Sequence, residues 1–179
     1  MIHDFKTFPV IISERFILRQ LKIEDAVNLY KLRSDKRVNE FINRIPAKSI
    51  ADVEVFIDNI NKGINDCKYF YWTIGFKNTD KVIGTICLWN IHLEKELAEI
   101  GFELLPEYQG LGIMSEAVDK VIQYGFNEMN LKTISAVVRT LNYKSIHLLE
   151  KKGFIMDVNK EISDELLGIG YELYYLLKK

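Results

Sequence analysis

The sequence has little cysteine and little proline, and it has no long apolar run. Of its 179 residues, only two are cysteine, three proline and ten glycine. Cys67 and Cys87 have no metal-like spacing, and two cysteines cannot form a disulfide framework, so we expect reduced thiols. No stretch approaches the ~20 apolar residues of a membrane span. The N-terminal residues, MIHDFKTFPV, lack the basic start and apolar run of a signal peptide. These absences predict a cytoplasmic protein that does not enter a membrane.

An excess of either charge is also missing. The chain has 24 Lys and Arg against 25 Asp and Glu, which gives a formal net charge of -1. This balance offers no electrostatic argument for direct nucleic-acid binding. With 48% hydrophobic residues and no linker-like or low-complexity segment, we expect residues 1–179 to form a single globular domain.

The hydrophobic pattern predicts an α+β fold around one mixed, mostly antiparallel sheet. We expect strands at residues 15–21, 69–76, 82–91, 98–105, 133–138, 154–162 and 165–177. We expect helices from about residue 24, from Ser49 to about Gly63, and at 113–129 and 143–152, with a loop or broken helix at 34–46. Strand 98–105, helix 113–129 and strand 133–138 follow one another, so the two strands pair most naturally in parallel through a right-handed crossover. The last two strands are expected to form a hairpin around residues 163–164.

Helix boundaries have local chemical signals. Ser49 with Asp52 resembles a capping box, in which the two side chains accept hydrogen bonds from each other's backbone amides. Asn142 is a good N-cap, and Gly153 can supply the left-handed residue that ends a helix.

The segment Tyr108-Gln109-Gly110-Leu111-Gly112 joins strand 98–105 to the long helix and is the strongest candidate for a binding site. The first amides of a helix have no partner within the helix and carry partial positive charge, so they can bind a phosphate. Glycine has no Cβ to keep such a group away. A tight structural turn explains the same glycines equally well. Two specific phosphate loops are excluded, because there is no Gly-Lys-Ser/Thr and the third glycine of the dinucleotide fingerprint falls on Ser115.

Three segments together resemble one family. Residues 109–113, QGLGI, resemble the acyl-CoA pyrophosphate loop Arg/Gln-x-x-Gly-x-Gly/Ala of the GCN-type N-acetyltransferase (GNAT) superfamily. Residues 142–154, NYKSIHLLEKKGF, resemble its Asn-x-x-Ser/Ala…Glu-Lys-x-Gly-Phe segment. Residues 13–19, SERFILR, with 24–26, EDA, resemble the N-terminal signature of the RimJ/RimL-like ribosomal-protein N-acetyltransferase branch.

The resemblance implies a splayed parallel strand pair with acetyl-CoA between its strands. The pyrophosphate would lie on the amides from Leu111 to Ser115, and backbone groups near Leu104 and Leu105 would hold the pantetheine. The residues that it assigns to cofactor binding are Leu104, Leu105, Gln109, Gly110, Leu111, Gly112, Ile113, Met114, Ser115, Asn142 and Ser145.

Two residues depart from the family pattern. Met114 occupies a position that is usually Gly or Ala, so its side chain is expected to turn into the core. Leu149 stands where many members have a tyrosine that protonates the departing thiolate. Leucine cannot donate a proton, but the RimJ/RimL-like branch also tends to lack that tyrosine.

Acetyl transfer to an amine requires a group that accepts the proton of the ammonium, because amines of pKa ~8 to ~10 are largely protonated at neutral pH. Glu99 and Glu103 share one face of a strand and suit a cationic acceptor; we favour Glu103 as the base, with Glu99 or water as alternatives. Ser145 is the candidate for the thiolate acid. Each of these residues also has a purely structural explanation. Glu99 and Glu103 can be exposed surface carboxylates, Ser145 can bond a backbone amide of its own helix, and Asn142 can be a plain N-cap.

The sequence therefore predicts an acetyl-CoA-dependent N-acetyltransferase that acts by direct transfer in a ternary complex and needs no metal. The favoured acceptor is a protein N-terminal α-amine. A small-amine enzyme for polyamines or aminoglycosides and a non-catalytic acyl-CoA-binding module are the alternatives. The apolar strand at 171–177 would allow a homodimer.

Overall fold

The computed structural model describes residues 7–79, 81–160 and 172–179. Its strands are β1 (Ile11–Ile12), β2 (Phe16–Gln20), β3 (Phe70–Phe76), β4 (Val82–His92), β5 (Leu97–Leu104), β6 (Thr133–Arg139), β7 (Ile155–Met156) and β8 (Glu172–Lys178). Its α-helices are α1 (Ala26–Ser34), α2 (Lys36–Asn39), α3 (Ile50–Asn65), α4 (Ile113–Asn127) and α5 (Tyr143–Lys151). Short 3-10 helices lie at Ile23–Asp25, Leu93–Lys95 and Pro106–Tyr108.

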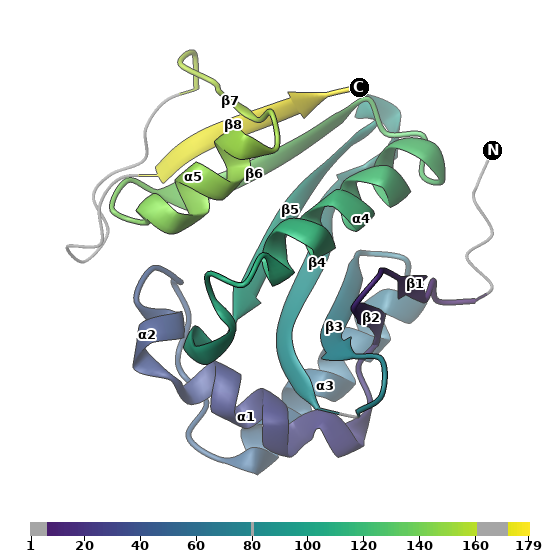
Figure 1. The fold of residues 1–179 in the computed structure, drawn as a ribbon. Helices are drawn as coiled ribbons and strands as arrows, with labels where there is room; N and C mark the ends of the chain where they lie inside the picture. The colour runs from purple at the N-terminus through teal and green to yellow at the C-terminus, as the bar shows by residue number, and fades with distance from the viewer. Residues whose placement is uncertain (1–6, 80, 161–171) are drawn as a thin grey trace.

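The strands form one sheet in the order β1-β2-β3-β4-β5-β6-β8-β7. Only β5 and β6 are parallel neighbours in the described part of the chain, which confirms the predicted α+β fold. Their register covers three positions, Leu97↔Thr133, Ala98↔Ile134 and Glu99↔Ser135. Beyond these positions the two strands diverge (Figure 1).

Helices cover both faces of the sheet (Figure 1). α4 and α5 lie on one face and are joined by an ion pair of 2.6 Å between Lys152 and Asp119. The main core packs beneath them and includes fully buried Trp72 and Ile86. α1 and α3 cover the other face through a second buried cluster that includes Leu29 and Ile57. Burial of apolar area on both faces is the main term that stabilises the fold.

The predicted helix caps are confirmed. The Ser49 hydroxyl accepts from the Asp52 amide at 3.2 Å, and the Asp52 carboxylate accepts from the Ser49 amide at 3.0 Å. The Asn142 side chain accepts from the Ser145 amide at 3.2 Å, and Gly153 adopts φ +83°. α3 continues two residues beyond the predicted end at Gly63, which is buried against the Tyr69 ring.

The C-terminal hairpin is shorter than predicted. β7 has two residues where a strand over 154–162 was expected, and the turn at 163–164 lies outside the described residues. β8 pairs with β6 over its whole length and with β7 at Leu176 and Tyr175. This part of β8 is therefore an interior strand and cannot extend the sheet into a second copy through its backbone. A homodimer formed in another way stays a prediction.

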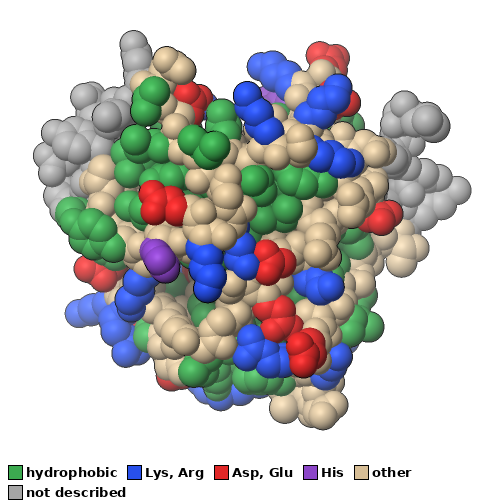
Figure 2. Space-filling model, turned by 45° about the horizontal axis from the view of Figure 1, so that its top comes forward, with side chains coloured by type: hydrophobic (Ala, Val, Ile, Leu, Met, Phe, Trp, Pro, Cys, Tyr) green, Lys and Arg blue, Asp and Glu red, His purple; other side chains and the backbone are tan. Residues whose placement is uncertain are grey.

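The surface carries interspersed charges. On the face drawn in Figure 2, basic and acidic side chains are mixed, and apolar side chains gather mainly in the upper and left part of the view. His92 and His147 are exposed, and His3 lies outside the described residues. No helix in the described ranges is long and apolar enough to cross a membrane.

Candidate active site

The strand-to-helix turn has the geometry expected of an anion-binding loop. Gly110 and Gly112 have φ of +78° and +73°, the left-handed region that favours glycine. The first helical hydrogen bond of α4 runs from the Glu116 amide to the Gly112 carbonyl at 3.1 Å. The amides of Ile113, Met114 and Ser115 therefore have no carbonyl four residues earlier within the helix, and the partial positive charge of the helix adds to theirs.

Space is open where a ligand would approach this turn. No heavy atom lies within 4 Å of the position that a Cβ on Gly110 would occupy. The side chain of Met114 is buried, with 8% exposure, and packs in the core with Ala117 and Val118. This placement confirms that Met114 turns away from the loop, so its backbone amide stays available to a phosphate.

Arg15, just before β2, contacts the turn although it lies 96 residues before Leu111 in the sequence. Its Nε lies 2.8 Å from Glu116 Oε2, and its Nη1 donates to the Leu111 carbonyl at 3.1 Å. This tie fixes the glycine turn against the first turn of α4. Arg15 is part of the N-terminal signature, but the sequence alone does not indicate that it contacts this loop.

The turn also contacts α5 across the diverging strands. Lys144 Nζ donates to Gln109 Oε1 at 3.0 Å, and Gln109 Nε2 donates to the Leu104 carbonyl at 3.1 Å. The structure thus brings the predicted residues of the turn close to the N-terminus of α5, where Asn142 and Ser145 lie. Lys144 was missed as a site residue, although it lies inside the matching segment.

Three backbone groups of Leu104 and Leu105, the residues predicted to hold the pantetheine, already have partners. The Leu105 amide donates to the Ile83 carbonyl at 2.9 Å, the Leu105 carbonyl accepts from the Tyr108 amide at 3.0 Å, and the Leu104 carbonyl accepts from Gln109. The predicted pantetheine contact at these two residues therefore narrows to the Leu104 amide.

Glu103 lies in a buried polar cluster. Its side chain contacts Arg44 at 2.6 Å and Arg33 at 4.0 Å, and Thr85 Oγ1 donates to it at 3.0 Å. The Tyr71 hydroxyl donates to the same carboxylate at 3.4 Å, and burial raises the pKa of this tyrosine well above its usual range. Glu103 is 8% exposed, which excludes the structural explanation that it is an exposed surface carboxylate. The two arginines come from α1 and the loop after α2, and no sequence pattern indicated them.

Glu99 has different surroundings on the same face of β5. It is half-buried, and Asn90 Nδ2 donates to its Oε2 at 3.1 Å. Burial raises the pKa of its carboxyl, and hydrogen bonds from Asn90 and Trp89 oppose that rise. The two candidate carboxylates thus differ in partners and access.

The structure also shows the surroundings of Ser145, the candidate acid, and of Leu149, which stands where many family members have a tyrosine. The Ser145 hydroxyl has no hydrogen-bond partner among the described side chains and backbone groups, while its amide is bonded to Asn142. Leu149 is buried in the main core, so nothing at that position can give a proton. Within the described ranges, no three His, Cys, Asp or Glu side chains converge as metal ligands.

The fold and the site define a class of protein. A sheet with one splayed parallel pair, opening beside a glycine turn at a helix N-terminus, is the architecture of GNAT acetyltransferases, and the family model described as "Acetyltransferase (GNAT) domain" matches residues 15–155. The chain belongs to this family. It is an N-acetyltransferase whose acyl donor is acetyl-CoA, and the open cradle at Gly110 with the amides of α4 fits the pyrophosphate of that donor.

Individual relatives support the same assignment. The chain is 37% identical over 153 residues to the uncharacterized N-acetyltransferase p20 of Bacillus licheniformis, covering 83% of this chain and 86% of that one. It is 27% identical to a spermidine N(1)-acetyltransferase of Vibrio cholerae, covering 80% of each chain. A crystal structure of a probable acetyltransferase has a TM-score of 0.82 at 25% identity, covering 96% of this chain and 97% of that one. A ribosomal-protein-S5-alanine acetyltransferase from Vibrio fischeri shares the fold, with a TM-score of 0.81 at 23% identity over 95% of this chain and 96% of that one.

Proposed function

We propose that this enzyme transfers the acetyl group directly to a primary amine, with both reactants bound side by side between β5 and the start of α5. The observation that carries this proposal is the divergence of β5 and β6 after three paired positions, next to the anion-binding turn. Acetyl-CoA supplies the acetyl group, and the edge of β5 that β6 leaves unpaired aligns it beside the acceptor. Such positioning alone accelerates a two-substrate reaction substantially.

We assign the proton acceptor to Glu99. A base needs access to the ammonium and an appreciable affinity for its proton. Both oxygens of Glu103 contact arginine, threonine or tyrosine groups in a buried site, so an acceptor ammonium reaches Glu103 less easily than it reaches Glu99. Glu99 is more accessible, and its raised pKa favours proton uptake. The surroundings of Glu103, the residue that the sequence favours as the base, support an ion-pair role instead.

Ser145 is the proposed proton donor to the departing thiolate. It lies in the first turn of α5, and its hydroxyl has no other partner in the described structure. As the amine nitrogen forms its bond to the acetyl carbon, the carbon–sulfur bond breaks. The ammonium loses one proton to Glu99 before the amine attacks, and the nitrogen loses a second proton to solvent as the amide forms. Sulfur receives a proton from the Ser145 hydroxyl, which solvent then reprotonates.

The proposed acceptor is a peptide or protein α-amine. The wall beside Glu103 contains Arg33 and Arg44, which would repel the several positive charges of a polyamine. The relationship to a spermidine enzyme keeps a small amine as the second candidate. The two candidates share one mechanism and differ only in the groups that contact the acceptor.

The test is acetyl-CoA turnover, measured as released thiol, with peptides bearing a free N-terminus, with spermidine and with an aminoglycoside. Mass spectrometry of the product locates the acetyl group. We expect peptide α-amines to react with higher kcat/KM than spermidine. A clear preference for spermidine would reverse the assignment of the acceptor.

Glu99→Gln tests the base. We expect kcat to fall by roughly 100- to 10,000-fold, the usual contribution of a general base. The loss should be greatest at mildly acid pH and partly relieved at high pH, where the amine loses its proton to solvent. In the wild type, a base is active above its pKa, so the raised pKa of Glu99 should move the acid limb of the profile to higher pH than an unperturbed glutamate would give. Wild-type rates in Glu99→Gln across this profile would assign the base elsewhere.

A further inference from the structure

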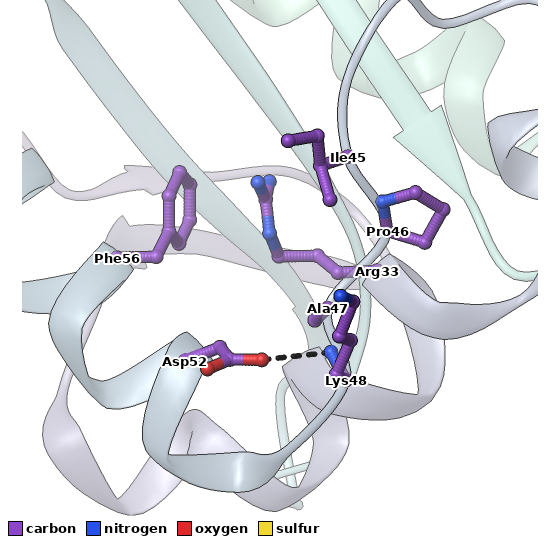
Figure 3. Close-up of a pocket in the computed structure, with 7 residues that line it drawn as sticks. All are labelled: Arg33, Ile45, Pro46, Ala47, Lys48, Asp52 and Phe56. Atoms are coloured by element: carbon purple, nitrogen blue, oxygen red, sulfur yellow. Dashed lines mark hydrogen bonds between the residues drawn. The ribbon is translucent and has the colours of Figure 1, made fainter.

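A cavity opens on the face of the sheet covered by α1 and α3. It has a volume of about 310 Å³ and is lined by Arg33 from α1, by Ile45 and Lys48 from the following loop, and by Asp52 and Phe56 from α3. Figure 3 shows the Arg33 guanidinium standing between the Phe56 ring and Ile45. Arg33 also reaches Glu103 at 4.0 Å, which connects the cavity to β5 and the proposed active site.

Positive charge exceeds negative charge around this cavity. Of the lining residues, Arg33 and Lys48 are basic and Asp52 is acidic, while Arg44 and Glu103 form an ion pair beside Arg33. The Asp52 carboxylate accepts from the backbone amides of residues 48 and 49 at 2.8 and 3.0 Å, so it is used by the helix cap. Arg44 Nη2 lies 2.6 Å from Glu103 Oε2, and Arg44 Nε donates to Asn39 Oδ1 at 2.6 Å. The shared Glu103 therefore cannot neutralise both guanidinium groups.

Arg33 is the cation that lacks full compensation. Only 14% of its side chain is exposed, and its guanidinium lies 3.6 Å from the centre of the Phe56 ring. Burial and the nearby Arg44 lower the pKa of Arg33, which shows the electrostatic penalty of this arrangement. An anion in the cavity would relieve the penalty, and a guanidinium fixed against an aromatic ring is well prepared to bind a carboxylate or phosphate.

We propose that this cavity binds an anionic group, a carboxylate or a phosphate, carried by the acceptor amine. The inference rests on the proposed function, because it names the acceptor class of the same site. Glu99 and Glu103 are four residues apart on β5, so their α-carbons are about 13 Å apart. A peptide with an acidic side chain within its first few residues fits this span, as does a small amine with an anionic tail.

The experiment compares acceptors that differ only in charge. One arm uses peptides that are identical except for Glu, Gln or Lys at the second or third position. The other arm uses free glutamate, phosphoethanolamine and spermidine. Each is measured as kcat/KM with the wild type, Arg33→Gln and Lys48→Gln, with melting temperatures to show that the variants fold. Arg37→Gln is the matched control, because Arg37 is an exposed arginine just after α1 whose partner is Asp35.

We expect the wild type to prefer the Glu peptide over the Gln peptide at least 10-fold. Arg33→Gln should abolish this preference, Lys48→Gln should reduce it, and Arg37→Gln should keep it. A preference seen only with the small acids would identify a small anionic amine as the source of the same group. Equal kcat/KM for Glu and Gln acceptors, or a preference that survives Arg33→Gln, would overturn the inference while leaving the acetyltransferase proposal intact.

Direct binding decides the case in which no acceptor reacts. Such a result would count against the proposed acceptor, and calorimetry with the Glu peptide would then test the cavity by itself. Binding to the wild type that Arg33→Gln removes supports the anion site. Binding that is absent, or equal in both proteins, overturns it.

Discussion

Two glutamates on β5 have opposite surroundings, and their substitution should separate stability from activity. Glu103→Gln keeps the shape of the side chain but leaves Arg44 and Arg33 without a buried carboxylate. Removing one partner of a buried ion pair typically costs about 3–5 kcal/mol. We expect a loss near the lower end of that range in urea unfolding, because the arginines keep slight solvent contact.

Glu99→Gln is the matched control for this prediction. Its carboxylate is charged in a partly buried site that disfavours the charge, since the pKa is raised. Above that pKa, replacement by a neutral amide removes the penalty, so stability at pH 7 should be unchanged or slightly higher. The advantage should vanish as the pH falls through the pKa of Glu99. If Glu103→Gln is as stable as the wild type, Arg33 and Arg44 are solvated in the variant and the prediction for Glu103 is wrong.

At the level of the element, the glycine turn and the first turn of α4 have separable tasks. Gly110→Val places a branched side chain in the open cradle and in a backbone conformation with φ +78°, so affinity for CoA should fall strongly. Met114→Ala removes buried core atoms, so it should cost ~2–5 kcal/mol of stability and leave the affinity nearly unchanged. Calorimetric titration and urea unfolding of both variants measure the two effects. Unchanged CoA affinity in Gly110→Val would remove the turn from the site.

The elements that were predicted correctly from sequence have local causes. The capping box at Ser49, the N-cap at Asn142 and the stop at Gly153 depend on residues a few positions apart. The cluster around Glu103 could not be predicted in this way. Arg33 and Arg44 reach it from a helix and a loop far away in sequence, so their positions depend on how α1 packs on the sheet. Arg15 and Lys144 show the same limit, since each lies in a recognised segment but meets its partner only in the fold.

For the whole molecule, the parallel pair β5–β6 is a short connection between the two parts of the sheet. Between β5 and β6 only three register positions connect the five strands on one side with the three on the other, within the described residues. The ion pair between α4 and α5 and the hydrogen bond from Lys144 to Gln109 add to this connection. A donor bound between the strands would contact both parts and hold them together.

Acetyl-CoA should therefore protect the diverging strands from hydrogen exchange. In the free protein, amides of residues 100–104 and 136–139 that face the divergence should exchange faster than amides of β3 and β4, which have neighbours on both sides. Adding CoA at about 100 times its Kd should stabilise the protein by about 2.7 kcal/mol and slow exchange at these positions first. Gly110→Val, compared at the same CoA concentration, should show neither effect because the cradle is blocked. Protection that appears in β1 and β2 instead would place the donor outside the splayed pair.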